Sequence, residues 1–144
     1  MKFERILVVC IGNICRSPAA EAMLRHRLSP DHEVSSAGIA ALVDHAAFAP
    51  IVELMRQRGL DLSGHRARQL TREMTARSDL ILVMEKKHVN EIHALAPESR
   101  GRVYRLGHWL DQEIPDPYRK SPEYCERILD LIEESVASWQ ERLE

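Results

Sequence analysis

A cysteine and an arginine with five residues between them lie near the start of the chain. The run 9–18 reads Val-Cys-Ile-Gly-Asn-Ile-Cys-Arg-Ser-Pro, after an apolar segment and before a helix-like one. Backbone N–H groups in a short loop at a helix N-terminus point inward and, with the helix dipole, attract a tetrahedral anion. The spacing therefore predicts an anion-binding loop with Cys10 at its base and Arg16 at its end.

The other side chains of this run suit the same chemistry. Arg16 offers a planar fork of donors for two phosphate oxygens, and Gly12 permits either a positive φ or a close approach to the ligand. The positive field favours the thiolate of Cys10, and we expect the Ser17 hydroxyl to donate to its sulfur. Pro18 fits a first helical turn. The run predicts phosphoryl transfer through a cysteine nucleophile.

The remaining loop residues divide between support and substrate contact. We expect the Asn13 amide to shape the loop by hydrogen bonds and to adopt a left-handed backbone conformation. Ile11 and Ile14 are apolar, which is unusual for a loop. We therefore expect them to line a wall for an aromatic ring, together with Leu42 and Tyr118.

Two interpretations remain open for the second cysteine of the loop. Cys15 could form a reversible disulfide with Cys10 that protects the nucleophile from irreversible oxidation, or it could be a small buried thiol. Cys125 falls on the apolar stripe of a helical segment and is expected in the core. No further cysteine pair is present, so we expect neither a zinc site nor any other metal or cofactor.

Cleavage of a phosphate ester also needs an acid opposite the nucleophile, because the leaving oxygen must be protonated. The chain has 22 acidic residues, so composition does not select one. Asp116 stands between Pro115 and Pro117, whose fixed φ angles stiffen the segment. The residues alone leave a general acid and a simple Asp-Pro surface turn equally open.

The order of motifs resembles the low-molecular-weight protein tyrosine phosphatases over nearly the whole chain. The run 9–18 is similar to the active-site loop of that family, and Asp116-Pro117-Tyr118 is similar to its general-acid loop. Segments 35–38, 67–71 and 80–85 match its intervening motifs in order. The resemblance implies hydrolysis of phosphotyrosine through a cysteinyl-phosphate, with Cys10 as nucleophile, Arg16 as phosphate ligand and Asp116 as general acid. It also implies a supporting network of Asn13, Ser17 and Ser36.

The chain resembles in particular the bacterial branch that is paired with tyrosine autokinases of capsule and exopolysaccharide export. Segments 64–65, 96–98, 107–109 and 113–121 carry this likeness. It implies that the partner is a phosphotyrosine protein, namely a membrane tyrosine autokinase engaged through its cytoplasmic tail.

Two other functions compete with this interpretation. Arsenate reductases of the same fold share the loop, but they relay a disulfide through a further cysteine pair, and segment 79–98 contains no cysteine. A phosphate-binding module without turnover would not need all of Cys10, Arg16 and Asp116, and all three are present.

Length and composition set the remaining limits. The 144 residues fit one domain, 1–144, and the net charge of −2 without a basic run argues against nucleic acid. The apolar runs are too short to insert into a membrane. The N-terminal segment leads directly into the strand that ends at Cys10, so we expect no cleavable signal peptide. A reactive thiol and an odd cysteine count indicate a reducing cytoplasm.

Alternating strand and helix patterns predict an α/β fold with a parallel sheet, and the resemblance implies the Rossmann-like fold of this phosphatase family. We expect a four-stranded parallel sheet with helices on both faces. The expected strands are 6–9, 33–36, 80–83 and 103–105. The expected helices are 19–28, 50–58, 71–76, 86–96 and 122–142. Cys10 would then lie at the carboxyl end of a strand, where such sheets bind ligands.

Overall fold

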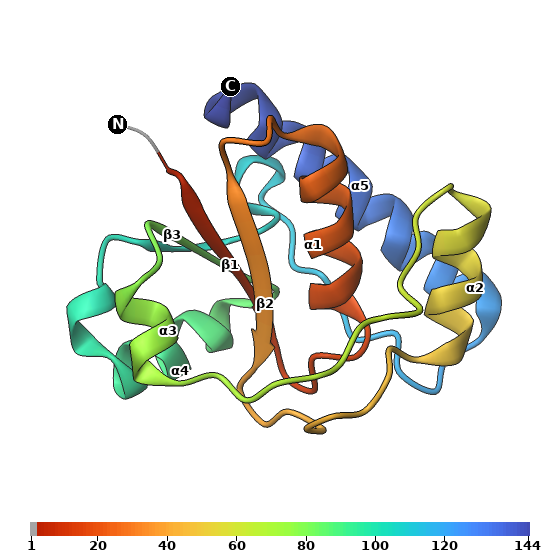
Figure 1. The fold of residues 1–144 in the computed structure, drawn as a ribbon, viewed down its shortest axis with the longest axis horizontal. Helices are drawn as coiled ribbons and strands as arrows, with labels where there is room; N and C mark the ends of the chain where they lie inside the picture. The colour runs from red at the N-terminus through yellow and green to blue at the C-terminus, as the bar shows by residue number, and fades with distance from the viewer. Residues whose placement is uncertain (1–2) are drawn as a thin grey trace.

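The computed structural model describes residues 3–144. A four-stranded parallel sheet lies in the middle of the molecule (Figure 1). The strands lie side by side in the order β2-β1-β3-β4. They are β1 (Arg5–Cys10), β2 (Glu33–Gly38), β3 (Leu80–Val83) and β4 (Val103–Arg105). The parallel sheet predicted from the sequence is confirmed, and each strand limit agrees within two residues.

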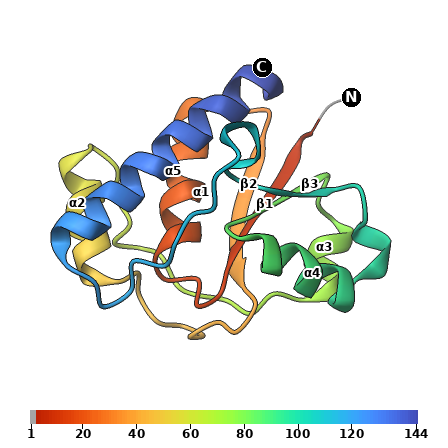
Figure 2. The same ribbon diagram turned by 180° about the vertical axis from the view of Figure 1, so that it is seen from behind.

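Five α-helices cover both faces of this sheet, as predicted (Figure 2). They are α1 (Arg16–Arg27), α2 (Ala49–Gln57), α3 (Arg72–Ala76), α4 (Lys86–Leu95) and α5 (Pro122–Leu143). The short 3-10 helices η1 (Pro97–Ser99) and η2 (His108–Leu110) were not expected. Within residues 3–144, no helix combines the length and the apolar composition that a membrane crossing requires.

The alternation of side chains along β1 separates two cores. Ile6 and Val8 face the larger one, which is built with α1, α2 and α5. Leu7 and Val9 face the smaller one, which includes side chains of α3 and α4. All four residues of β3 are buried, so this strand is covered on both faces.

Two helix ends carry residues that suit a helix terminus. The Ser121 side chain accepts from the Tyr124 N–H and caps α5, and Gly59 ends α2 with a φ of 85°. Helix α1, however, begins three residues before the predicted start, at Arg16. The end of the anion-binding loop is thus already the first helical turn, which directs its N–H groups toward the loop.

The strand order places Cys10 at the point where the order of the strands in the sheet reverses. Strand β1 is central: Cys10 pairs with Gly38 of β2 on one side, and Val9 pairs with Val83 of β3 on the other. The chain leaves β1 toward β2 and later returns to β3 on the opposite side, which makes the carboxyl end of β1 a switch point. Ligands bind at such points in open α/β sheets.

Candidate active site

The anion-binding loop, residues 11–15, connects β1 to α1 and is held by a neighbouring segment. The N–H groups of Ile39, Ala40 and Leu42 donate to the carbonyl oxygens of residues 10, 11 and 12 at 2.9, 2.9 and 3.1 Å. Gly38 makes this approach possible, because a Cβ atom there would lie 2.5 Å from the Ile11 carbonyl oxygen. The loop is therefore fixed along the end of β2.

Cys10 is buried at the base of the loop, and its sulfur meets a hydroxyl. The Cys10 Sγ lies 2.9 Å from Ser17 Oγ, as expected from the sequence. Asn13 Nδ2 donates to the same Ser17 Oγ at 2.7 Å. Either atom of this contact could be the donor. A thiolate has no hydrogen to donate, so in that form the sulfur would accept from the serine hydroxyl.

The backbone of the loop turns at Asn13 and not at Gly12. Asn13 has a φ of 59°, which confirms the left-handed conformation expected for it. Gly12 has no positive φ, so the first of the two roles considered for it is wrong. A Cβ atom at Gly12 would make only ordinary contacts, 3.7 Å from Ile14 and 4.0 Å from Leu42. Close approach to a ligand, the second role, stays a prediction for Gly12.

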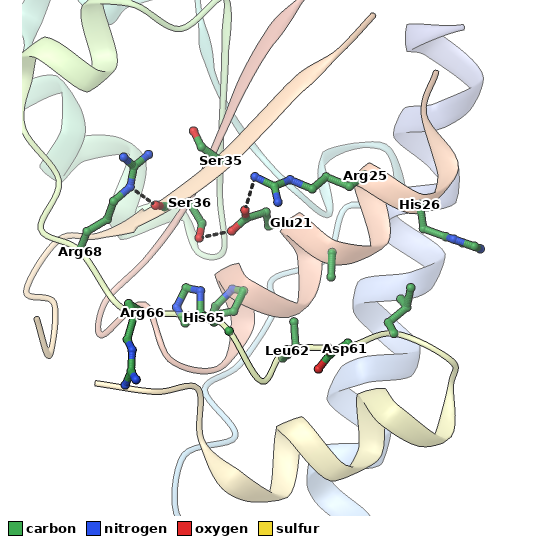
Figure 3. A pocket seen from close by; sticks show the side chains of 14 residues that line it. Glu21, Arg25, His26, Ser35, Ser36, Asp61, Leu62, His65, Arg66 and Arg68 are labelled. Carbon is green, nitrogen blue, oxygen red and sulfur yellow. Dashed lines mark hydrogen bonds and ion pairs between the residues drawn. The ribbon is translucent and has the colours of Figure 1, made fainter. Parts of the chain in front are cut away.

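The supporting network extends further than the sequence predicted, and Figure 3 shows its members Glu21, Ser36, His65 and Arg68. Asn13 Nδ2 donates to Ser36 Oγ at 3.0 Å, and Ser36 Oγ donates to Glu21 Oε1 at 2.5 Å. Arg68 donates its N–H to Asn13 Oδ1 at 3.0 Å and its Nε–H to the Ser36 carbonyl oxygen at 2.8 Å. His65 Nε2 donates to the Asn13 carbonyl oxygen at 2.7 Å. The side-chain amide and the carbonyl oxygen of Asn13 thus have partners.

Glu21, His65 and Arg68 were not predicted for this network. His65 and Arg68 lie more than 50 residues from Asn13, so only the folded chain shows their contacts. A cavity of about 790 Å³ adjoins the network, and its lining includes Glu21, Ser36 and His65. Cys10, Arg16 and Asp116 do not line it, so this cavity is separate from the anion-binding loop.

Arg16 is 2% exposed, and one nitrogen anchors it. Its Nη1 donates to Glu85 Oε2 and to the Ile114 carbonyl oxygen, both at 2.7 Å. Its Nε and Nη2 donate to no atom of residues 3–144, which leaves a fork of donors for an anion. Burial raises the pKa of Glu85, but the Arg16 hydrogen bond and charge outweigh it, and the pKa is lowered. Glu85 was not predicted as a site residue.

Asp116 is exposed on the segment before α5, and its side chain is held locally. Its Oδ1 accepts from the Tyr118 N–H at 3.0 Å. The following residue, Pro117, accepts from the buried Cys125 thiol of α5 at 3.5 Å. The charge of Asp116 reaches the loop, since it raises the pKa of Cys15 after the larger effect of burial.

The three cysteines are free and buried. Burial keeps the Cys15 thiol protonated, because its pKa lies far above the ordinary value. Cys125 is fully buried on α5, in the core position expected for it. The disulfide between Cys10 and Cys15 stays a hypothesis.

Apolar side chains lie beside the loop. Ile14 is 8% exposed, whereas Leu42 is 40% exposed near Gly12. Tyr118 packs edge-on against Phe48 with ring centroids 5.0 Å apart, and the Phe48 N–H donates to the Ile14 carbonyl oxygen. Phe48 was not predicted here. Ile11 is half-buried. These contacts connect Tyr118 to the loop through Phe48.

Comparison with known proteins agrees with this geometry. A putative low molecular weight protein-tyrosine-phosphatase of Klebsiella pneumoniae is 50% identical over 142 residues, which cover 98% of each chain. The phosphatase Etp of Escherichia coli K12 is 48% identical over 144 residues, 99% of this chain and 97% of its own. The crystal structure of the tyrosine phosphatase Wzb from Escherichia coli K30 with sulphate superimposes with a TM-score of 0.95, at 45% identity and 99% coverage of both chains.

The sequence pattern of one family extends over almost all of the chain. The pattern described as "Low molecular weight phosphotyrosine protein phosphatase" matches residues 5–144, which include the loop and Asp116. The chain belongs to the low molecular weight phosphotyrosine protein phosphatases.

Proposed function

We propose that this chain hydrolyses phosphotyrosine through a cysteinyl-phosphate intermediate. The observation that carries the proposal is the 2.9 Å contact between Cys10 Sγ and Ser17 Oγ at the base of an anion-binding loop. A hydroxyl at this distance would stabilise a sulfur anion next to the position where phosphorus would lie. Family membership and the anchored Arg16 support the same reaction.

In the first step the Cys10 thiolate attacks phosphorus. An S–P bond forms and the bond to the phenol oxygen breaks. Asp116 gives its proton to that oxygen, so the product leaves as neutral tyrosine. Arg16 Nε and Nη2, with the loop N–H groups, hold the non-bridging oxygens where negative charge collects.

In the second step Asp116 acts as a base. It takes a proton from water as the water oxygen attacks phosphorus, and the S–P bond breaks. Inorganic phosphate forms and Cys10 leaves as a thiolate. The Ser17 hydroxyl lies 2.9 Å from the sulfur and donates to this leaving thiolate.

Hydrolysis of para-nitrophenyl phosphate by wild type and Cys10→Ser tests the reaction. The serine variant should show no turnover yet still bind inorganic phosphate. Glu53→Gln is the control, since it changes only an exposed partner of Arg56 on α2 and should keep its activity. Turnover in Cys10→Ser would contradict the mechanism, and a wild type that binds phosphate without hydrolysis would indicate a binding module.

We further infer that the substrate is a phosphotyrosine protein of the bacterial cytoplasm, namely a membrane tyrosine autokinase of exopolysaccharide or capsule export. The likeness to bacterial phosphatases such as Etp and Wzb supports this partner, and a reactive thiol suits a reducing compartment. A Cys10→Ser trap should retain such a kinase from extract through its phosphorylated tail. Retention that persists after the tail tyrosines are changed to phenylalanine would contradict the proposal.

A further inference from the structure

A buried histidine lies behind the arginine of the loop. His88, on α4, is fully buried, and its Nδ1 accepts from the Glu85 N–H at 3.2 Å. Because Nδ1 is an acceptor, the neutral ring carries its hydrogen on Nε2. His88 thus takes the place of the glutamate or glutamine that usually accepts this N–H in a capping box.

The second ring nitrogen is without a partner. His88 Nε2 is buried and makes no hydrogen bond within residues 3–144. It lies 3.7 Å from Glu85 Oε2, the same oxygen that accepts from Arg16 Nη1 at 2.7 Å. A buried donor without an acceptor is rare in proteins and calls for an explanation. Here the unused donor faces the carboxylate that anchors Arg16.

We propose that His88 is a positioning residue that holds the Glu85 carboxylate against Arg16 and so sets the affinity of the loop for phosphate. A bound phosphoryl group competes with Glu85 for the positive charge of Arg16. The Nε2–H then gives the carboxylate a second donor after a shift of less than about 1 Å, which brings the pair to hydrogen-bond distance. The inference rests on the proposed function only in that Arg16 binds phosphate.

The surroundings of His88 keep its ring neutral. The charged groups that face it are Arg16 of α1 and, from its own segment, Glu85, Lys87 and Glu91. Burial, and then Arg16, lower the pKa of His88. Protonation would put a hydrogen on Nδ1, directed at the Glu85 N–H, so two donors would oppose each other. The contact with Glu85 therefore requires the neutral ring.

Substitutions of His88 test the proposal through competitive inhibition by inorganic phosphate. His88→Phe removes both ring nitrogens, and we expect phosphate to inhibit about tenfold more weakly. His88→Gln restores an acceptor for the Glu85 N–H and an amide donor, and we expect inhibition within about threefold of wild type. His93→Phe is the control: His93 lies on the same helix with an unpartnered Nε2, and phosphate inhibition should not change.

A double-mutant cycle separates positioning from general support of the helix. If His88 acts through Glu85, adding His88→Phe to Glu85→Gln causes no further weakening of phosphate binding. Equal inhibition of wild type and His88→Phe, or additive effects in the cycle, would overturn the proposal.

A second readout does not depend on turnover or on the phenylalanine variant. In Cys10→Ser, nitrogen NMR of the histidine rings should show His88 as the neutral Nε2–H form, with a signal that moves when phosphate is added. An Nδ1–H form, or no response while phosphate binds, would overturn the proposal. Loss of hydrolysis in wild type with this response intact would instead refute only the proposed function.

Discussion

Arg16 Nη1 donates to the carbonyl oxygen of Ile114 at 2.7 Å, two residues before Asp116. The Ile114 N–H in turn donates to the Met84 carbonyl oxygen just after β3. The residue that we propose binds phosphate is thus joined directly to the segment that carries the proposed acid. Phosphate binding and the position of the segment that carries the proposed acid therefore both depend on the buried guanidinium of Arg16.

Arg16→Lys should lose both functions of this side chain. Lysine cannot use one nitrogen for Glu85 and Ile114 while it offers two others to phosphate, because it lacks the planar fork. We expect kcat to fall on the order of 10²–10³-fold, as for the loss of a transition-state donor. Steady-state kinetics with para-nitrophenyl phosphate measure this. A lysine variant with near wild-type kcat would show that point charge alone suffices.

Asp116→Asn should slow the first step most for substrates with a poor leaving group. Without an acid, a phenyl phosphate expels an unprotonated phenolate, so the rate of the first step should fall about 10²–10⁴-fold. A nitrophenyl ester, whose leaving group needs no proton, should lose much less in that step. Single-turnover rates for both esters measure this difference. Equal losses for the two esters would assign the proton to another group.

The residues whose spacing alone predicted the site are local in the chain, whereas Ser36 and the acid role of Asp116 were predicted from the resemblance to the family. The contacts of Ser17 with Asn13 and Cys10 join residues only four and seven positions apart in the sequence. The spacing within the loop therefore determines these contacts. Glu85 and His65 reach the loop from 69 and 52 residues away, through strand order and loop path. No periodicity in the sequence records such contacts, so they became visible only in the fold.

Ser17→Ala should leave the loop folded but remove the hydroxyl from the Cys10 sulfur. The thiolate then loses a hydrogen bond both as nucleophile and as leaving group. We expect kcat to fall about tenfold or more, the effect of one charge-assisted hydrogen bond. Alkylation of Cys10 by iodoacetate should also need a higher pH than in wild type. Unchanged alkylation would mean that other groups stabilise the sulfur anion.

Gly38→Ala should displace the anion-binding loop. The added Cβ atom would lie 2.5 Å from the Ile11 carbonyl oxygen and 3.1 Å from Ala41. Backbone cannot yield as a side-chain tip can, and overpacking of this kind costs about 1–3 kcal/mol. Urea unfolding and kcat should both show the loss. Gly64→Ala is the control, since a Cβ atom there meets nothing within 4 Å.

The fold itself was largely predictable, because each strand and helix carries its own pattern. The continuous apolar run of β3 and the capped, striped α5 appear as expected. The start of α1 was misplaced because Arg16 and Ser17 are polar and resemble loop residues. In the structure these two residues form the first turn of α1, directly after the anion-binding loop.

Glu85→Gln should destabilise the chain in a pH-dependent way. Glu85 has a lowered pKa in the folded chain, since Arg16 outweighs the cost of burial. A carboxylate of this kind stabilises the fold above its ordinary pKa of 4.5, and the benefit is lost as the pH falls through the lower folded value. At pH 7 we expect a loss of about 1.5–3 kcal/mol, the range for a hydrogen bond to a charged group.

Urea unfolding of wild type and Glu85→Gln between pH 7 and pH 3 measures this dependence. The difference between the two proteins should be constant near neutrality and shrink below about pH 4.5, where the unfolded wild type begins to take up its proton. Glu53→Gln removes a surface partner of Arg56 and should change the unfolding free energy little at any pH. A difference for Glu85→Gln that stays constant down to pH 3 would show that the Arg16 contact stabilises through packing and not through charge.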